Sequence, residues 1–263
     1  MNSALRFLLL VLSFVGLPGG VVASNADVNR LFAEAQTAFE QADALPVADA
    51  AAKTEAFRRA ASRYQAIVDH GFRSGVVYYN LGNARVRADE PGQAIAAYLS
   101  AKRYLPLDPY LEANLRSVIG PGTKPSTPII EHVFFWQNLI GYPQKFRAAT
   151  ILGILTVLAA TTLIFLPHRR TRQMTLFLLA LTTVASLSAV YDWYRFDFLR
   201  HGVVAIEQAT PRKGNSLQYE PAFTTPLPLG SLGIVTDQRG DWLQLRFDAD
   251  REAWLPREQV VVF

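Results

Sequence analysis

Two long apolar runs separated by a short charged link constrain this chain more than any other feature. Neither Ala148–Leu166 nor Met174–Val190 contains an ionisable side chain. At a rise of about 1.5 Å per residue, helices of about 17 to 19 residues can cross a hydrocarbon core roughly 30 Å thick. The short link Pro167–Gln173 makes the two helices antiparallel neighbours. The runs predict a transmembrane helical hairpin over residues 148–190, and the alternative is a buried hairpin of a large soluble protein.

The charges around the runs predict an orientation. Arg169, Arg170 and Arg172 all lie in the link. Short loops rich in Lys and Arg stay in the cytoplasm, so we expect the link to be cytoplasmic and the rest of the chain to lie on the other side. Lys145 and Arg147 on the opposite flank weaken this asymmetry without reversing it.

Residues 1–23 have the character of a secretory signal peptide. Arg6 precedes the apolar stretch Phe7–Leu17, and the small residues Val21–Ala23 provide a cleavage site before Ser24. The alternative is an uncleaved anchor helix. Either reading gives the same topology for the rest of the chain.

Residues 24–119 are predicted to be entirely helical. In Ala26–Ala44 and in Thr54–Asp69, apolar residues recur every three or four positions and form one stripe along each helix. We expect Asp27 to cap the first helix and Gly71 to end the second. A third pattern, in Gly75–Pro109, is more specific.

This third segment resembles the tetratricopeptide repeat, a helix–turn–helix unit of about 34 residues. The matching positions are Tyr78, Leu81, Gly82, Ala94, Tyr98, Ala101 and Pro106. Two residues depart from the pattern, because Arg85 stands where an aromatic is preferred and Leu105 where Asp is usual. A degenerate unit precedes this repeat, and a single helix, Tyr110–Ile119, follows it as a cap. The resemblance implies a tetratricopeptide helix-hairpin solenoid, and an unrelated helical bundle is the alternative.

Residues 120–147 are expected to join this domain to the membrane. Gly120–Pro128 is rich in proline and glycine, which is typical of a linker. Ile129–Arg147 is rich in aromatic residues and suits a helix at the level of the lipid headgroups. A short amphipathic helix packed on the soluble domain is the alternative.

Residues 203–263 are predicted to form a small all-β barrel. The expected strands are Val203–Glu207, Gly233–Asp237, Trp242–Phe247, Glu252–Leu255 and Val260–Phe263. The arrangement resembles bacterial SH3-like domains. The resemblance rests on Arg212–Ser216, Leu229-Gly230, Trp242 and Ala253-Trp254-Leu255.

The chain carries no pattern typical of an enzyme. Cysteine is absent, and His70, His132, His168 and His201 lie in different segments, so no metal site is implied. There is no nucleophile elbow and no glycine-rich phosphate loop. The net charge of +4 is not gathered into a basic stripe, which argues against nucleic acid as a partner. We therefore expect no catalytic residue, no cofactor and no metal.

Binding surfaces are the remaining candidates for function. Tyr79, Asn83 and Arg87 follow at four-residue spacing, off the packing face of their helix, where they would line the concave side of a solenoid. Trp242 and Trp254 are candidates for lining a peptide or glycan groove of the barrel. The alternatives are a solvated helix face and tryptophans that belong to the core.

The order of these parts resembles the BatE-like family of the bacterial aerotolerance (Bat) system. The resemblance includes a DPxxxANL-like phrase at Asp108–Leu115. It implies a periplasmic scaffold anchored in the bacterial inner membrane, with a role in aerotolerance, oxidative stress or envelope stress. The partners it implies are membrane proteins with von Willebrand factor A domains and a MoxR-type ATPase system. The alternative is an anchored cell-wall module that binds peptidoglycan.

Overall fold

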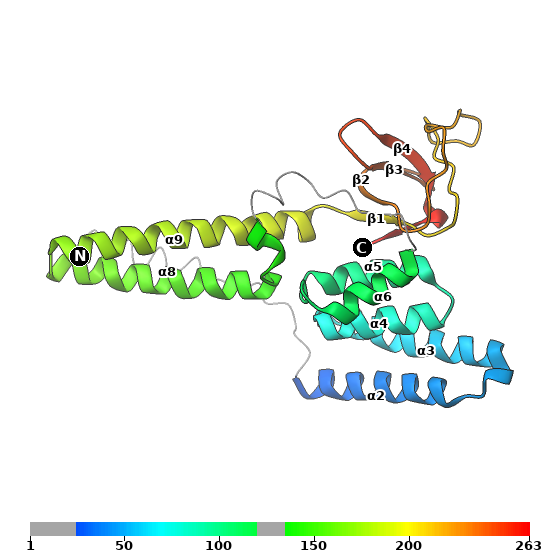
Figure 1. Cartoon of the computed structure of the whole chain (residues 1–263), viewed down its shortest axis with the longest axis horizontal. Coiled ribbons are helices and arrows are strands. Elements are labelled where there is room, and N and C mark those ends of the chain that lie inside the picture. Colours follow the sequence, from blue (N-terminus) through cyan, green and yellow to red (C-terminus); the bar gives the residue numbers. More distant parts are fainter. Residues whose placement is uncertain (1–24, 120–134) are drawn as a thin grey trace.

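The structure is a computed structural model that describes residues 25–119 and 135–263 (Figure 1). The expected signal peptide and the linker at 120–128 lie outside the described residues. Within them the chain is mostly helical, with seven α-helices and one five-stranded antiparallel sheet.

Five of these helices form the N-terminal part, and each packs against the next along the chain. They are α2 (Asn25–Ala44), α3 (Ala50–Asp69), α4 (Gly75–Arg87), α5 (Pro91–Lys102) and α6 (Pro109–Ile119). Since α2 begins at Asn25, Asp27 lies in its first turn and is not the cap that the sequence suggested. Gly71 follows α3 with a φ of +84°, a left-handed conformation that ends the helix as predicted.

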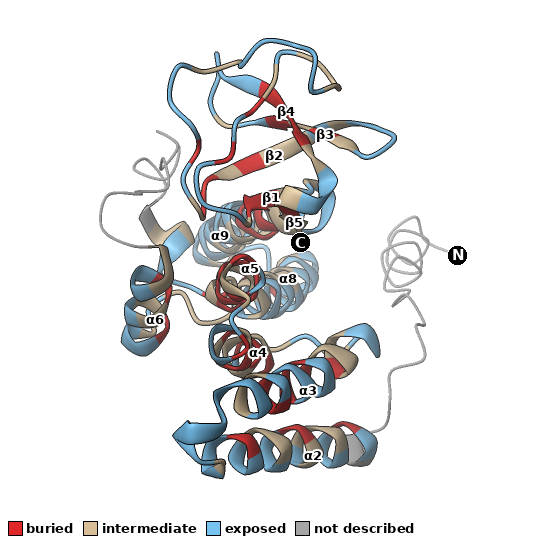
Figure 2. Ribbon diagram, turned by 90° about the vertical axis from the view of Figure 1, so that its right-hand side faces the viewer, coloured by how far each residue is buried: buried red, intermediate tan, exposed pale blue. Residues whose placement is uncertain are grey.

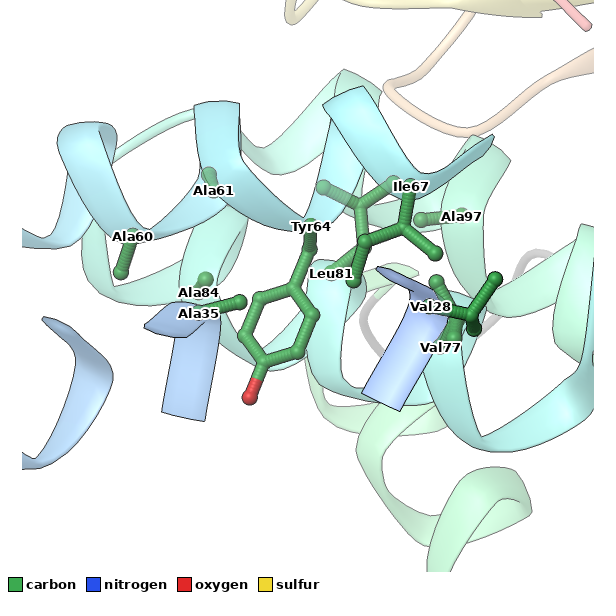
Figure 3. Packing of buried hydrophobic residues seen from close by; sticks show 10 residues of the cluster. All are labelled: Val28, Ala35, Ala60, Ala61, Tyr64, Ile67, Val77, Leu81, Ala84 and Ala97. Atoms are coloured by element: carbon green, nitrogen blue, oxygen red, sulfur yellow. The ribbon is translucent and has the colours of Figure 1, made fainter. Parts of the chain in front are cut away.

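Small residues bring α2, α3, α4 and α5 close together. The cluster drawn in Figure 3 consists of Val28, Ala35, Ala60, Ala61, Tyr64, Ile67, Val77, Leu81, Ala84 and Ala97. Figure 3 shows the Tyr64 ring beside Ala35 and Ala84, so the alanines leave room for one large aromatic side chain.

The predicted close contact between α4 and α5 lies at Gly82. A Cβ atom there would collide with the Tyr98 ring. The two departures from the repeat pattern also have physical reasons. Leu105 packs over Gly75, and Arg85 pairs with Glu90 at the turn between the two helices.

Two long helices form an antiparallel hairpin, α8 (Tyr142–Phe165) and α9 (Arg169–Trp193), and a π-helical turn, η3 (Tyr194–Phe198), extends α9. Both helices are long and apolar enough to span a membrane. Of the 24 residues of α8, only Lys145 and Ala159 are buried. The hairpin therefore lacks the burial expected for the core of a soluble protein.

The segment before α8 differs from the single interfacial helix expected over residues 129–147. From residue 135 onward the chain forms a 3₁₀ turn, η2 (Phe135–Asn138), and then begins α8 at Tyr142. Gly141 is extended and Pro143 occupies the first turn of α8, so the helix starts there. As a result α8 begins before the apolar run itself.

A buried ion pair closes the base of the hairpin. Lys145 Nζ lies 2.6 Å from Asp192 Oδ2, and the two side chains are only 3% and 4% exposed. Lys145 Nζ also donates to the Gln137 carbonyl oxygen at 2.8 Å, and Ser188 Oγ donates to Gln137 Oε1 at 3.1 Å. These contacts tie η2, α8 and α9 together.

A second polar cluster, which we call the joint, connects α5 to the hairpin. The Arg103 guanidinium donates to Asp197 Oδ2 at 2.7 Å and stacks on the Tyr142 ring with its Cζ 3.7 Å from the ring centre. The Tyr142 hydroxyl donates to the same carboxylate, and the Tyr142 N–H donates to the Arg103 carbonyl oxygen at 3.0 Å. The helical part is thereby fixed to the ends of α8 and α9.

The C-terminal sheet matches the five predicted strands to within a few residues. They are β1 (His201–Val204), β2 (Leu232–Arg239), β3 (Trp242–Arg246), β4 (Glu252–Pro256) and β5 (Val260–Val262). The order in the sheet is β4-β3-β2-β1-β5, and every neighbouring pair is antiparallel. A 3₁₀ turn, η4 (Arg257–Gln259), precedes β5.

The sheet packs directly on the helices, with β1 and β5 lying along α5 (Figures 1 and 2). Val203 of β1 and Val261 of β5 belong to the same apolar cluster as Ile95 of α5. A Cβ at Gly92 would collide with Ala205, so the two backbones approach closely. We call this contact the seam, and it joins two parts that the sequence presented as separate domains.

Candidate partner-binding groove

A hollow of about 390 Å³ lies among α2, α4, α5 and α6, and we call it the α4 groove. Its lining residues are Phe39, Asn83, Val86, Arg87, Tyr98, Asn114 and Ser117. The groove thus contains two of the three α4 residues proposed from the sequence, Asn83 and Arg87. The third, Tyr79, reaches it through a hydrogen bond to Asn114.

Hydrogen bonds organise the floor of the groove. Asn83 Oδ1 accepts from the Tyr98 hydroxyl at 2.8 Å and from Asn114 Nδ2 at 2.9 Å. Asn114 Nδ2 also lies 3.1 Å from the Tyr79 hydroxyl oxygen. Burial raises the pKa of Tyr98 well above its ordinary value, so its hydroxyl stays protonated and donates at neutral pH. The network fixes Asn83 and holds α6 against α4.

Arg87 forms the charged side of the groove. Its guanidinium pairs with Asp43 near the end of α2, and both side chains remain about half exposed, at 50% and 51%. The Cζ atom lies 5.3 Å from the Phe57 ring centre and 6.0 Å from that of Phe39. Arg87 therefore has an internal partner that solvent, or another carboxylate, can replace.

The two tryptophans lie elsewhere, on β3 and β4 of the sheet, and the structure does not bring them to the groove. Trp254 is only 6% exposed and lies beneath the guanidinium of Arg239, whose Cζ is 5.2 Å from its ring. Its backbone N–H and carbonyl pair with Arg212 of the long loop after β1. Trp242 is half-buried.

The sequence patterns did not predict a binding role for Phe39, Val86, Asn114 and Ser117, which line the groove, or for Asp43, which pairs with Arg87. Asn114 is part of the DPxxxANL-like phrase, but the pattern alone gave it no role. Phe39 and Asp43 come from α2, and helical periodicity cannot indicate which other helix their side chains approach. The only signal was their spacing of four residues on one helix face.

The described histidines lie in different elements of the structure. His70 is at the end of α3, His168 precedes α9 and His201 begins β1, while His132 lies outside the described residues. Within residues 25–119 and 135–263 there is no group of three or more His, Asp and Glu side chains able to hold a metal ion.

Comparison with known proteins gives no relative from which a role can be transferred. No protein-family model matches the chain, and neither a curated protein nor a solved structure matches it.

Proposed function

We propose that this chain is a membrane-anchored scaffold that binds a partner protein in the α4 groove. The observation that carries the proposal is the groove itself, a hollow bordered by four helices and lined on its α4 side by Asn83, Val86 and Arg87. Because the hydrogen bonds beneath it are already formed, a partner would meet an ordered surface, which lowers the entropic cost of binding.

The composition of the groove suits a polypeptide. Phe39 and the 40% exposed Val86 offer apolar contact, and Arg87 offers a planar cation with several donors. Aromatic residues and arginine are enriched among the side chains that dominate interface energies. A partner segment with an apolar anchor and a carboxylate would fit these contacts.

The helical array supports the more specific assignment to a tetratricopeptide solenoid. Gly82 lies against Tyr98, where that repeat requires a small residue, and α6 packs on α5 as the predicted cap. The five-stranded order and the long loop between β1 and β2 are compatible with an SH3-like barrel. Membership of the BatE-like family, with von Willebrand factor A proteins and a MoxR-type ATPase system as partners, is part of the same proposal.

The proposed topology places the helical array and the sheet on the outer side of the inner membrane. Arg169, Arg170 and Arg172 all lie in the first turn of α9, at the tip of the hairpin. Alkaline phosphatase fused after Phe263 should be active, and a fusion at Arg170 should be inactive. Activity of the Arg170 fusion alone would reverse the orientation.

The alternative function, peptidoglycan binding through the sheet, has weaker support. Trp254 is covered by Arg239, so of the two tryptophans only Trp242 offers a partly open ring. Purified sacculi separate the two functions. A scaffold should stay in the supernatant, whereas a cell-wall module should sediment with the sacculi and lose that property on Trp242→Ala.

Site-specific photo-crosslinking in the native membrane tests the groove. A photoreactive residue at Val86 should crosslink a protein partner, because Val86 lines the groove. The matched control is Val76, which lies on the same helix, is 52% exposed and does not line the groove. Arg87→Ala should weaken the Val86 crosslink. Equal crosslinking from Val76 and Val86 would contradict the proposal.

A further inference from the structure

A second cavity, of about 420 Å³, lies on the other side of the α4–α5 pair, between these helices and the edge of the sheet. We call it the edge cleft. Its helical wall includes Tyr78, Leu81 and Arg103, and its sheet wall includes His201, Val262 and Phe263. Its volume falls within the range of about 300 to 1,000 Å³ that is typical of ligand sites.

The sheet wall is an edge strand. In the order β4-β3-β2-β1-β5, strand β5 has a neighbour on one side only. Phe263 and His201 exchange both backbone hydrogen bonds, at 3.0 and 3.2 Å. In an antiparallel ladder, hydrogen-bonded pairs alternate with pairs that are not hydrogen-bonded. Val262, next to Phe263 and opposite Gly202, belongs to a pair of the second kind, so its N–H and C=O point away from β1. An edge of this kind can accept one more strand.

The helical wall contains the Arg103 guanidinium, which has one hydrogen-bond donor without a partner in the described residues. The Arg103 side chain is 9% exposed, and its Nε is buried with no hydrogen-bond partner in the described part of the chain. An unpaired buried donor costs free energy, so a polar ligand that reached it would be stabilised. Arg73 also lines the cleft, is 56% exposed and lies 3.9 Å from Asp197, too far for a strong pair.

We propose that the edge cleft binds an extended acidic segment of a partner polypeptide. The segment would add to the free edge of β5 through the backbone of Val262, and an acidic side chain would accept a hydrogen bond from Arg103 Nε with Arg73 nearby. Main-chain pairing supplies affinity in this mode, and the position of the carboxylate supplies specificity. The site is separate from the α4 groove and does not depend on it.

Fluorescence anisotropy of short peptides with the full chain in nanodiscs of zwitterionic lipid tests the proposal. The probe is labelled Thr-Val-Glu-Val-Thr, capped at both ends, and its control replaces Glu by Gln. The Glu peptide should bind about tenfold more tightly than the Gln peptide, since it alone supplies the carboxylate. Equal binding of the two peptides would overturn the proposal.

Two variants locate the binding. Val262→Pro removes the outward N–H but no hydrogen bond of the β1 ladder, and Val262→Ala keeps that N–H. The Pro variant should lose about tenfold in affinity and the Ala variant less than about threefold. Arg103→Lys keeps a cation near Asp197 but has no Nε donor, so it should reduce the preference for Glu over Gln.

The proposal fails if Val262→Pro and Val262→Ala bind alike, or if Arg103→Lys leaves the preference for Glu unchanged. It also fails if the Glu peptide does not bind at about 1 mM. In that last case, loss of co-purified anionic lipid from Arg103→Lys would assign the cleft to a lipid headgroup.

Discussion

The base of the hairpin and the α4 groove each hold an ion pair between distant segments, but in opposite surroundings. Lys145 and Asp192 are almost completely buried, and Lys145 also donates to the Gln137 carbonyl oxygen. Arg87 and Asp43 pair with about half of each side chain in solvent. The chemistry of the two pairs is similar, and their exposure differs more than tenfold.

The difference in burial distinguishes an ion pair that maintains the fold from an ion pair that solvent can reach. Breaking a buried pair leaves one charge without water or partner, which costs about 3–5 kcal/mol, whereas an exposed pair contributes about 0–1 kcal/mol. The first pair therefore fixes the relation of η2, α8 and α9. The second pair can exchange its carboxylate for that of a partner at little cost in stability.

The largest expected effect comes from breaking the buried pair. Asp192→Leu leaves Lys145 unpaired and should lower the melting temperature of the full chain in detergent by about 6–20 °C. The double variant Lys145→Met/Asp192→Leu should recover most of this loss, because neither charge remains. Circular dichroism measures both. A single variant as stable as the unaltered protein would show that the pair is not structural.

The joint is intermediate in burial and should be intermediate in effect. Asp197→Asn weakens the charged hydrogen bonds from Arg103 and Tyr142, so we expect a loss of about 1.5–3 kcal/mol in thermal unfolding. The control is Asp248→Asn, since Asp248 is exposed and lies 3.5 Å from Arg251. If Asp197→Asn and Asp248→Asn lower the stability equally, the joint contributes no more to stability than an exposed ion pair.

Packing beneath the groove should matter more than its exposed charge. Gly82→Ala places a methyl group against the Tyr98 ring and should cost about 1–3 kcal/mol in thermal unfolding. The control is Gly153→Ala in α8, where the new Cβ would lie 4.0 Å from Thr182 Cγ2, an ordinary contact. If both variants unfold at the same temperature, the α4–α5 contact is looser than the structure shows.

Asp43→Asn should have a small effect, because it breaks only the exposed pair. We expect a loss of no more than about 1 kcal/mol, which shrinks further at high salt. Thermal unfolding at low and high salt measures it. A loss as large as that of Asp192→Leu would remove the distinction between the two regions.

His201 provides the smallest expected effect, because its side chain is only partly buried. Burial, with a contribution from Arg195, lowers the pKa of His201 below its ordinary value of 6.5. The unfolded chain therefore binds a proton more readily, so stability is complete above about pH 6.5 and falls as the pH drops below it. His201→Phe should flatten this part of the stability curve. An unchanged curve would assign the acid sensitivity to other groups.

The sequence predicted what depends on local pattern. The apolar runs gave α8 and α9, the three- and four-residue spacing gave the helices, and the short alternating runs gave the strands. The contact at Gly82 was predicted correctly, because a small residue at this position of the repeat pattern marks a close approach between two helices.

The contacts between distant segments could not be predicted in the same way. Lys145 and Asp192 flank the apolar runs, where charged residues at the membrane interface are common. The sequence around either residue does not indicate that the two form an ion pair. The repeat pattern singled out Ala94, Tyr98 and Ala101 of α5, but it did not show that Val203 and Val261 pack against Ile95. Asn83 and Arg87 of the groove followed from the helix face, whereas the positions of Asn114 and of Asp43, the partner of Arg87, depend on how α6 and α2 pack.

The seam also governs the order of events during synthesis. The face of α5 that β1 and β5 cover leaves the ribosome before α8 and α9, and the strands that cover it leave after them. Until then, apolar surface around Ile95 has no cover from the sheet, and transiently exposed surface of this kind promotes aggregation. The apolar face of α5 is therefore covered only after the hairpin has been synthesised. A chain that stops before β1 leaves this apolar surface exposed, where quality-control proteases and chaperones can recognise it.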